Sequence, residues 1–280
     1  MNVAVTAASG KLGSAIIRKL VKQIGKKNVI GIARNPNKAG HFGVEIRKGD
    51  YNNKSDFELA LLDIDILLLV SGMDAPEKRI GQHRNVINAA KETGVKKIVY
   101  TSIIGKEGDT TFDPVIRSNR QTENDIQKSG LQWSIGRNGL YIEPDIEAIE
   151  DYKKAGEIAN CAGDGLASYT TREDLAQAYS QMILHDDRNN QLFNLTGKPI
   201  AQSQLVAFMN QSFKTNLRYR EMSPDDYLKF QQKVNGEFLG AIIAGIYEKI
   251  RNGEFVADSN YTNAAGREHM SWGKYFEQLK

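Results

Sequence analysis

Residues 6–13, which read Thr-Ala-Ala-Ser-Gly-Lys-Leu-Gly, carry the pattern with the clearest chemical use. They follow the apolar run of residues 3–6 and precede residues 12–24, whose apolar side chains recur with helical spacing. A helix that begins here offers unpaired N–H groups and the positive end of its dipole, and the small residues let a pyrophosphate approach. The loop predicts nucleotide binding; the alternative is that its glycines only permit close packing of a helix on a sheet.

The loop departs from the expected glycine pattern at one position. Gly10 and Gly13 match the second and third glycines of a GxxGxxG loop, whereas Ala7 stands where the first is expected. The methyl group of Ala7 is expected to tighten the steric requirement of the turn without abolishing it.

The residues after the second apolar run, residues 29–33, indicate which dinucleotide is bound. Sites for NAD place a carboxylate near the end of this strand to bind the ribose 2′-hydroxyl, but the next carboxylate here is Glu45. Arg34 can form paired hydrogen bonds to a 2′-phosphate, and Lys38 adds a positive charge. We therefore expect NADP(H) to be preferred over NAD(H); the alternative is that Arg34 is a solvated surface residue.

The elements that must position these residues alternate between strands and helices. Apolar runs of strand length lie at residues 3–6, 29–33, 44–46, 65–70, 97–100 and 133–135. Helical patterns fit between most of them, the clearest at residues 79–93, so the α/β class with a doubly wound parallel (Rossmann) sheet is expected. After residue 144 the pattern changes to helices (171–184, 203–213, 223–253) with isolated strands such as residues 192–195.

This change of pattern predicts two parts. Residues 1–145 form a dinucleotide-binding domain, to which segments near 155–197 return, and residues 146–280 form a smaller, mainly helical substrate lobe. Because no flexible linker separates them, the ligand site is expected in the cleft between them. The apolar run of residues 238–246 either shapes that cleft or forms a subunit contact of a homodimer.

Composition excludes several classes of protein. The 280 residues include 37 Lys and Arg against 34 Asp and Glu, and the basic residues are interleaved with acidic ones, so no nucleic-acid partner is expected. The single cysteine, Cys161, and four scattered histidines argue against a disulfide framework and a zinc site. The sequence shows no leader pattern and no apolar stretch of membrane-spanning length, so a cytoplasmic location without membrane insertion is expected.

Several motifs follow one another in the order found in a known family. They occupy residues 6–13, 34–36, 49–51, 82–90, 99–102, 137–141, 162–165, 171–176 and 195–197. In this the chain resembles the NmrA-like atypical short-chain dehydrogenases, and within them the bacterial NADPH:quinone oxidoreductases of type 2. The resemblance extends over nearly the whole chain and implies the Rossmann fold and NADPH-dependent reduction of quinone-like acceptors, with neither flavin nor metal.

The resemblance also implies roles for single residues. The pyrophosphate would lie on the Gly-rich loop, the 2′-phosphate on the arginine after the second strand, the adenine by Asp50, and the nicotinamide at later strand ends. The implied cofactor contacts are Thr6, Ala8, Ser9, Gly10, Lys11, Leu12, Gly13, Arg34, Lys38, Asp50, Val70, Ser71, Gly72, Tyr100, Thr101, Ser102, Asn138, Gly139, Leu140, Tyr141 and Arg172. Leu140 departs from the pattern, since quinone reductases carry a larger aromatic residue there.

The tyrosines lack the lysine partner that ordinary ketone reduction uses, and this limits the reactions possible on the acceptor side. Ordinary short-chain dehydrogenases use a Tyr-xxx-Lys pair, and none of the eleven tyrosines here has a lysine four residues later. Quinones need less help, because hydride transfer yields a resonance-stabilised anion that water can protonate. Asn138 is predicted as a hydrogen-bond donor to the acceptor and Tyr141 as a stacking wall; the alternatives are a turn-fixing Asn and a core Tyr.

Other interpretations stay open beside this one. The chain is also compatible with a non-catalytic NADP(H)-binding redox sensor of the NmrA type that acts through a protein partner, or with an imine, azo or enone reductase. His83 is expected to be a surface or capping residue on its helix, and the hydroxyls of Thr101 and Ser102 to lie near a ribose. The acidic residues at 145, 147, 150 and 151 are expected to form a solvated helix face.

Overall fold

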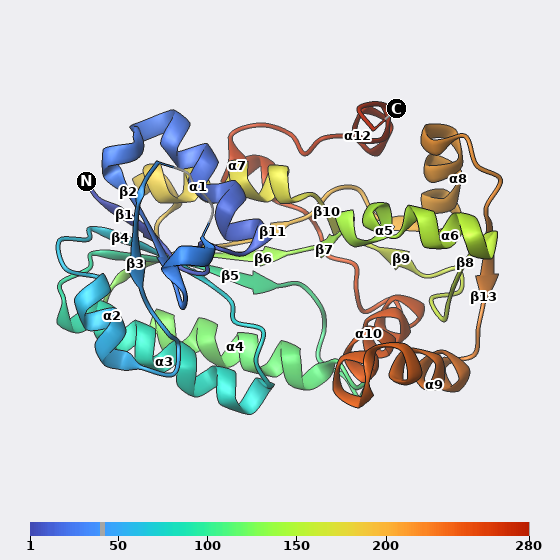
Figure 1. Cartoon of the computed structure of the whole chain (residues 1–280), viewed down its shortest axis with the longest axis horizontal. Helices are drawn as coiled ribbons and strands as arrows, with labels where there is room; N and C mark the ends of the chain where they lie inside the picture. Colours follow the sequence, from blue (N-terminus) through green and yellow to red (C-terminus); the bar gives the residue numbers. More distant parts are fainter. Residues whose placement is uncertain (40–42, 280) are drawn as a thin grey trace.

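The computed structural model of the chain describes residues 1–39 and 43–279. A seven-stranded parallel sheet with the strand order β11-β6-β5-β4-β1-β2-β3 forms its centre (Figure 1). The order reverses direction next to β1, as in doubly wound folds, and confirms the expected fold class. The strands are β1 (Val3–Val5), β2 (Val29–Ala33), β3 (Glu45–Lys48), β4 (Ile66–Val70), β5 (Lys97–Ile103), β6 (Gln132–Asn138) and β11 (Gln191–Leu195).

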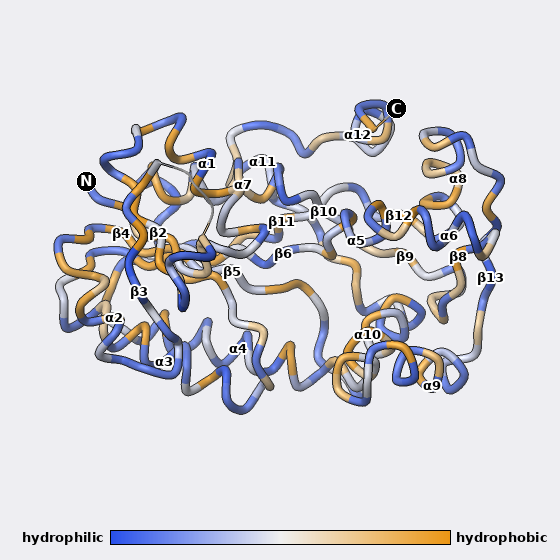
Figure 2. The backbone as a smooth tube through the Cα atoms, viewed as in Figure 1, coloured by the Kyte–Doolittle hydropathy of each residue, from blue (hydrophilic) through white to orange (hydrophobic). Residues whose placement is uncertain are grey.

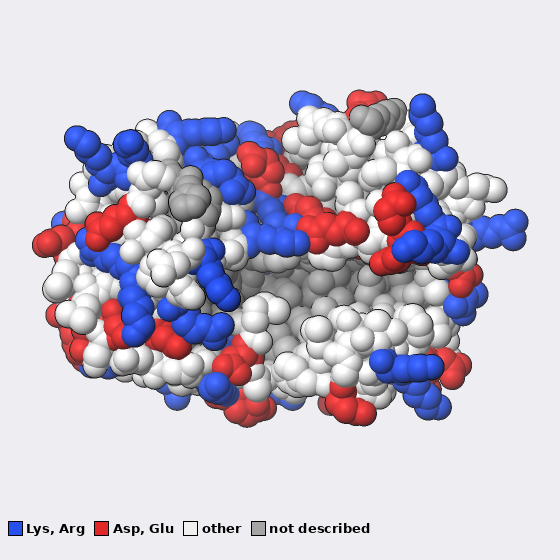
Figure 3. Space-filling view, viewed as in Figure 1, with Lys and Arg blue, Asp and Glu red and all other residues white. Residues whose placement is uncertain are grey.

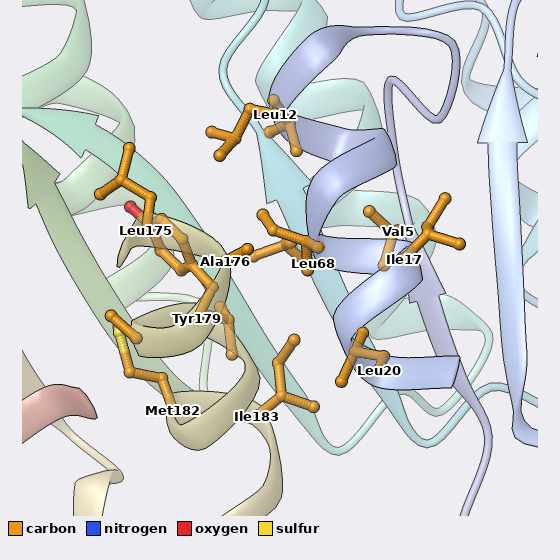
Figure 4. Packing of buried hydrophobic residues seen from close by; sticks show 14 of the residues in the cluster. Val5, Leu12, Ile17, Leu20, Leu68, Leu175, Ala176, Tyr179, Met182 and Ile183 are labelled. Carbon is orange, nitrogen blue, oxygen red and sulfur yellow. The ribbon is translucent and has the colours of Figure 1, made fainter. Parts of the chain in front are cut away.

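Helices cover both faces of the sheet because its strands are apolar on both sides. One face carries α1 (Lys11–Ile24) and α7 (Arg172–Leu184), and the other carries α2 (Lys54–Ala60), α3 (Pro76–Glu92) and α4 (Asp113–Gln127). Ile16, Ile17 and Leu20 of α1 are fully buried in the first layer, where α1 and α7 pack side by side (Figure 4). Full burial of such a side chain contributes about 1.5–3 kcal/mol, so this layer fixes the Gly-rich loop at the start of α1.

The C-terminal segment returns to this same layer, although only segments up to about residue 197 were expected to do so. Helix α11 (Tyr261–Ala265) packs on α7. The hydroxyl of Tyr261 donates to the backbone oxygen of Asp174, and the guanidinium of Arg267 lies 2.8 Å from the buried Asp174 carboxylate. Residues 261–267 thereby close the outer side of the nucleotide-binding part.

The second part of the molecule is built from short strand pairs and helices. Its core includes Phe112 and Ile116, which precede residue 145, so the two parts share packed side chains. Figure 2 shows the hydrophobic backbone segments of the first part at β2 and β4. Its strands are β7 (Leu140–Tyr141), β8 (Glu157–Asn160), β9 (Leu166–Ala167), β10 (Tyr169–Thr170), β12 (Ile200–Ala201) and β13 (Arg218–Glu221). Its helices are α5 (Glu143–Glu147), α6 (Ile149–Ala155), α8 (Gln202–Phe213), α9 (Pro224–Asn235), α10 (Glu237–Arg251) and α12 (Trp272–Glu277).

Two expected helices differ in their bounds, each for a local reason. Helix α3 begins at Pro76 rather than residue 79, because proline is favoured in the first turn, where its missing N–H is not needed. The helical segment 223–253 is divided at Gly236, whose φ of 79° ends α9 and lets α10 turn back against it.

The described part of the chain has neither a membrane-spanning helix nor a cluster of metal ligands. Among residues 1–39 and 43–279, no helix has the length and apolar character needed to cross a membrane. The same residues contain no group of three His, Cys, Asp or Glu side chains placed to hold a metal ion. Of the four histidines, His41 lies outside the described residues.

Candidate nucleotide and acceptor site

The Gly-rich loop forms a tight turn between β1 and α1. Ala7 adopts a φ of 49°, in the left-handed region that glycine favours, and its carbonyl accepts the N–H of Gly10 at 2.8 Å. A Cβ on Gly13 would lie 2.4 Å from the Ala7 oxygen, so only glycine fits there. No side chain caps α1 at Gly10, which leaves the amides of its first turn for a ligand. This is the backbone arrangement that holds a pyrophosphate.

The cations expected at the 2′-phosphate stand beside this loop. Arg34 and Lys38 follow β2, and both side chains are exposed. Neither forms an ion pair with a carboxylate of the described residues. Asp50 follows β3, and its carboxylate accepts from the backbone and side chain of Asn52 at 2.9 and 3.0 Å. The two cations are therefore available to a phosphate, whereas Asp50 is already tied to its own turn.

The strand ends of β1 and β4 are fixed by side chains of the predicted site. The hydroxyl oxygen of Thr6 accepts from the backbone N–H of Val70 at 2.9 Å, and the backbone N–H of Ser71 donates to Thr101 at 2.9 Å. Thr6 and Thr101 are buried. Both hydroxyls are thus used to hold neighbouring strands in register. A cofactor at these strand ends would therefore bind to backbone groups rather than to these hydroxyls.

Tyr100 and Ser102, on β5, point into the layer between the sheet and α4. The Tyr100 hydroxyl donates to Asn119 at 2.7 Å, and the Ser102 hydroxyl donates to Glu123 at 2.5 Å. Burial raises the pKa of Tyr100 to about 12. Asn119 and Glu123 lie four residues apart on α4. This helix supplies fixed hydrogen-bond acceptors rather than a phenol–amine pair.

The expectation for His83 is wrong, because the side chain is fully buried rather than exposed or capping. Its Nε2 accepts the backbone N–H of Gly72 at 3.0 Å, and its Nδ1 lies 2.9 Å from the Thr122 hydroxyl. Burial and the charge of Arg79 lower its pKa to about 3, so the imidazole stays neutral. His83 therefore fixes the loop after β4, where the cofactor ribose is expected.

A buried hydrogen-bonded row lies on the acceptor side. The hydroxyl of Tyr179, from α7, donates to the Asn138 Oδ1 at 2.6 Å, and the Asn138 Nδ2 donates to the Tyr141 hydroxyl at 3.1 Å. Asn138 is 4% exposed, and Tyr141 is half-buried. Gly139 lets β7 approach the segment beside it, since a Cβ there would lie 2.4 Å from the backbone oxygen of Ser168. Asn138 at the end of β6 and Tyr179 of the distant helix α7 thus hold the hydroxyl of Tyr141.

The charges next to this row come from α5, α7 and the Gly-rich loop. The guanidinium of Arg172 lies 5.7 Å from the centre of the Tyr141 ring and 3.0 Å from Glu147, and the ammonium of Lys11 lies 2.6 Å from the same carboxylate. Hydrogen bonds from Lys11 and Arg172 lower the pKa of Glu147. Burial raises the pKa of Glu143, which accepts the backbone N–H of Arg172. Glu147 joins two predicted cofactor-binding cations.

The acidic residues after β6 do not form one solvated face. Asp145 is buried and accepts the Tyr152 hydroxyl at 2.9 Å, and burial raises its pKa to about 6. Glu147, Glu150 and Asp151 are exposed, as expected. Figure 3 shows that the face bearing α5 and α10 is hollowed between them, with charged side chains on the upper rim and uncharged ones within. An apolar acceptor fits this composition better than a charged one.

Comparison with known proteins establishes the family. The family model described as NAD(P)H-binding matches residues 7–186. The chain is 32% identical over 229 residues to quinone oxidoreductase 2 of Escherichia coli K12, a match that covers 80% of this chain and 79% of that protein. This chain belongs to the NAD(P)H-binding family. The resemblance to the NmrA-like group is also confirmed, since it is 29% identical to an NmrA-like oxidoreductase of Aspergillus flavus over 81% of this chain and 76% of that one.

Solved structures of the NAD(P)H-binding family have the same architecture. The E. coli quinone oxidoreductase 2 in complex with NADPH superimposes with a TM-score of 0.89, at 28% identity and 99% coverage of both chains. The triphenylmethane reductase of Citrobacter sp. in complex with NADP(H) gives a TM-score of 0.91, at 28% identity and full coverage of both chains. These relatives are oxidoreductases, and this chain is an enzyme of that class.

The fold brings the predicted site residues to one edge of the sheet. The Gly-rich loop, Arg34, residues 70–72, residues 100–102 and residues 138–141 all follow or end parallel strands, whose carboxyl ends share that edge. The hydroxyls of Tyr100, Thr101 and Ser102 turn into internal contacts. Sequence reasoning missed Tyr179 and Glu143, and it placed Glu147 on a solvated face without its pairs to Lys11 and Arg172. Glu143 could have been noted from its place next to the 138–141 segment, whereas Tyr179 is distant in sequence.

Proposed function

We propose that this chain reduces quinone-like acceptors by direct hydride transfer from NADPH, in the cleft between its two parts. The proposal rests on one combination. The Gly-rich loop, whose helix has no side-chain cap, and the exposed Arg34 stand at the same sheet edge as the Asn138–Tyr141 segment, in a chain 32% identical to E. coli quinone oxidoreductase 2.

The residues present fit NADP(H). The amides at the start of α1 and the space at Gly13 accept a pyrophosphate, and Arg34 with Lys38 accepts a 2′-phosphate. We propose the backbone around Val70, Ser71, Gly72 and Thr101 as the nicotinamide side of the site. When bound, NADPH supplies the hydride that reduces the acceptor.

The acceptor side is proposed to lie between the 138–141 segment and the small lobe. Tyr141 forms one wall, with Arg172 against its outer face, and Asn138 keeps one amide N–H that no described residue accepts. Leu140, smaller than the aromatic expected from the resemblance, leaves more room beside this wall. Binding an apolar acceptor here excludes water and orients it for hydride transfer.

Further parts of the proposal follow from the sequence. Residues 146–280 act as the acceptor lobe, with segments near 155–197 returning to the 1–145 domain, and the enzyme works in the cytoplasm without flavin or metal. A homodimer would use the α9–α10 hairpin, where four large apolar side chains are exposed: Phe230, Val234, Phe238 and Leu239.

The initial rate of NADPH oxidation, measured with and without a small soluble quinone, tests the proposal. We expect quinone-dependent oxidation that is faster with NADPH than with NADH. Saturable NADPH binding without turnover would instead favour a redox sensor, and equal rates with NADH would contradict the role of Arg34.

A further inference from the structure

In the hydrogen-bonded row formed by Tyr179, Asn138 and Tyr141, the hydroxyl hydrogen of Tyr141 has no acceptor among the described residues. The Tyr179 hydroxyl lies 2.6 Å from Asn138 Oδ1, a length typical of O–H···O bonds, and the Asn138 Nδ2 lies 3.1 Å from the Tyr141 oxygen, a length typical of N–H···O bonds. The Tyr179 hydroxyl also lies 2.9 Å from the backbone oxygen of Gly136. With Asn138 Oδ1 facing Tyr179, the Asn138 amide N–H is directed at Tyr141. The Tyr141 oxygen accepts, so its own hydrogen is the end of the row.

That hydrogen has no acceptor among residues 1–39 and 43–279, although the Tyr141 ring is half-buried. A buried donor that no protein group satisfies is uncommon, and it is satisfied by a ligand or by water. The ring belongs to the two-residue strand β7, which pairs with β10, and Asn138 and Tyr179 hold its hydroxyl from the inner side. The donor is thus held in a fixed direction before any ligand binds.

The surroundings keep this hydroxyl protonated and place a cation near its oxygen. The guanidinium of Arg172 lies 5.7 Å from the ring centre, and a cation at that distance stabilises negative charge on the phenol oxygen. Burial has the opposite and larger effect and holds the pKa of Tyr141 near 12, so the group is protonated at neutral pH. It enters the reaction as an acid.

On the basis of the proposed function, we propose that Tyr141 is the catalytic proton donor to the oxygen of the quinone acceptor, with Asn138 and Tyr179 as its positioning residues. One hydride, carrying two electrons, reduces the quinone, and NADPH is oxidised to NADP⁺. The O–H bond of Tyr141 breaks as a new O–H bond forms on the acceptor, which gives the neutral hydroquinone. Water then returns a proton to the Tyr141 oxygen.

Infrared difference spectroscopy tests the hydrogen bond without turnover. The wild-type protein and Tyr141→Phe are each saturated with NADP⁺, which cannot reduce the acceptor, and a soluble quinone is added. We expect the quinone carbonyl band at a lower frequency in the wild type than in Tyr141→Phe. Coincident bands in the two proteins would overturn the proposal.

Turnover provides the second test. For Tyr141→Phe we expect quinone reduction to fall on the order of 100-fold, with loss of the solvent deuterium isotope effect and NADPH affinity within about twofold of wild type. A cationic triphenylmethane dye accepts hydride without needing a proton, so any wild-type rate with such a dye should persist in the variant. Tyr219→Phe, which removes a hydroxyl bonded to Asn160 in the small lobe, is the matched control.

The outcomes separate this inference from the proposed function. Quinone turnover by the wild type with an unchanged rate and isotope effect in Tyr141→Phe would overturn the proton-donor role alone. Absence of quinone turnover in the wild type would overturn the proposed function, and the proton donation with it.

Discussion

The nucleotide side and the acceptor side of the site are built in different ways. On the nucleotide side, consecutive residues of one turn present backbone N–H groups, and the exposed cations Arg34 and Lys38 pair with no carboxylate of residues 1–39 and 43–279. On the acceptor side, Asn138, Tyr141 and Tyr179 come from separate elements, and their polar atoms are bonded to one another inside the protein. On the nucleotide side, the phosphates of a bound ligand would supply the charges that pair with the cations. On the acceptor side, the polar groups are hydrogen-bonded to one another before a ligand binds.

Because of this difference, the two sides tolerate different substitutions. Backbone binding depends on a few dihedral angles and on the lack of a Cβ, so side-chain changes that keep the turn are tolerated. A buried polar network depends on every member, because loss of one partner leaves another unsatisfied at a cost of about 1–3 kcal/mol. The following predictions test this contrast, in order of decreasing expected effect.

The largest expected effect concerns His83, a buried polar side chain hydrogen-bonded to Gly72 and Thr122. Its folded-state pKa of about 3 lies below the unfolded value, so its contribution to stability is complete above pH 6.5 and is lost as the pH falls. The loss amounts to about 1.4 kcal/mol per pH unit, or about 3 kcal/mol at pH 4.5. Urea unfolding of the wild type and His83→Gln between pH 7.5 and 4.5 measures it. A constant difference between the two proteins across this range would refute the prediction.

The next effect concerns the nucleotide side, where one exposed cation is expected to act independently. Arg34→Ala should weaken NADPH binding about 10- to 100-fold, since a hydrogen bond to a charged group contributes about 1.5–3 kcal/mol, and should change NADH binding little. Fluorescence titration with both cofactors measures this. Lys27→Ala, at the opposite end of β2, is the control. Equal loss for the two cofactors would place the 2′-phosphate elsewhere.

A smaller effect tests the claim that this side depends on backbone geometry. Ala7 has a φ of 49°, which costs an L-residue about 1–2 kcal/mol, and glycine avoids that cost but loses about 0.5–1 kcal/mol of chain entropy. Ala7→Gly should therefore raise the free energy of unfolding by about 0.5–1 kcal/mol and leave NADPH affinity unchanged. Urea midpoints decide this, with Ala15→Gly in the regular part of α1 as a control that should be destabilised.

The smallest effect concerns Glu147, where the two sides meet. Its carboxylate pairs with Lys11 and Arg172, and exposed pairs of this kind contribute about 0.2–1 kcal/mol. Glu147→Gln should free Lys11 of the Gly-rich loop for the pyrophosphate and tighten NADPH binding roughly two- to fivefold. The same titration with Glu150→Gln, which loses only a pair with Lys153, is the control. Weaker binding in Glu147→Gln would show that the pairing helps to form the site.

The same contrast separates the features that the sequence predicted correctly from those that it did not. The sheet, the turn at Gly10 and Gly13 and the helix start at Thr171 depend on neighbouring residues, and all were predicted correctly. His83 and Asp145 were assigned wrongly, because their burial results from packing with Gly72, Thr122 and Tyr152, which no local pattern reveals. The contacts of Asn138 could not be predicted either, since Tyr179 lies 41 residues away. The cofactor and acceptor roles themselves stay predictions.

The return of α11 to the first layer has a consequence for synthesis of the protein. Domains generally fold as units while the chain emerges from the ribosome, N-terminal part first. Here Tyr261, Ala264 and Ala265 complete the layer over α7, and Arg267 neutralises the buried Asp174. The layer over α7 therefore stays without its last cover, and Asp174 without its ion pair to Arg267, until residues 261–267 have left the ribosome. Truncation before Tyr261 would leave this layer incomplete, although the last strand of the central sheet, β11, ends at Leu195.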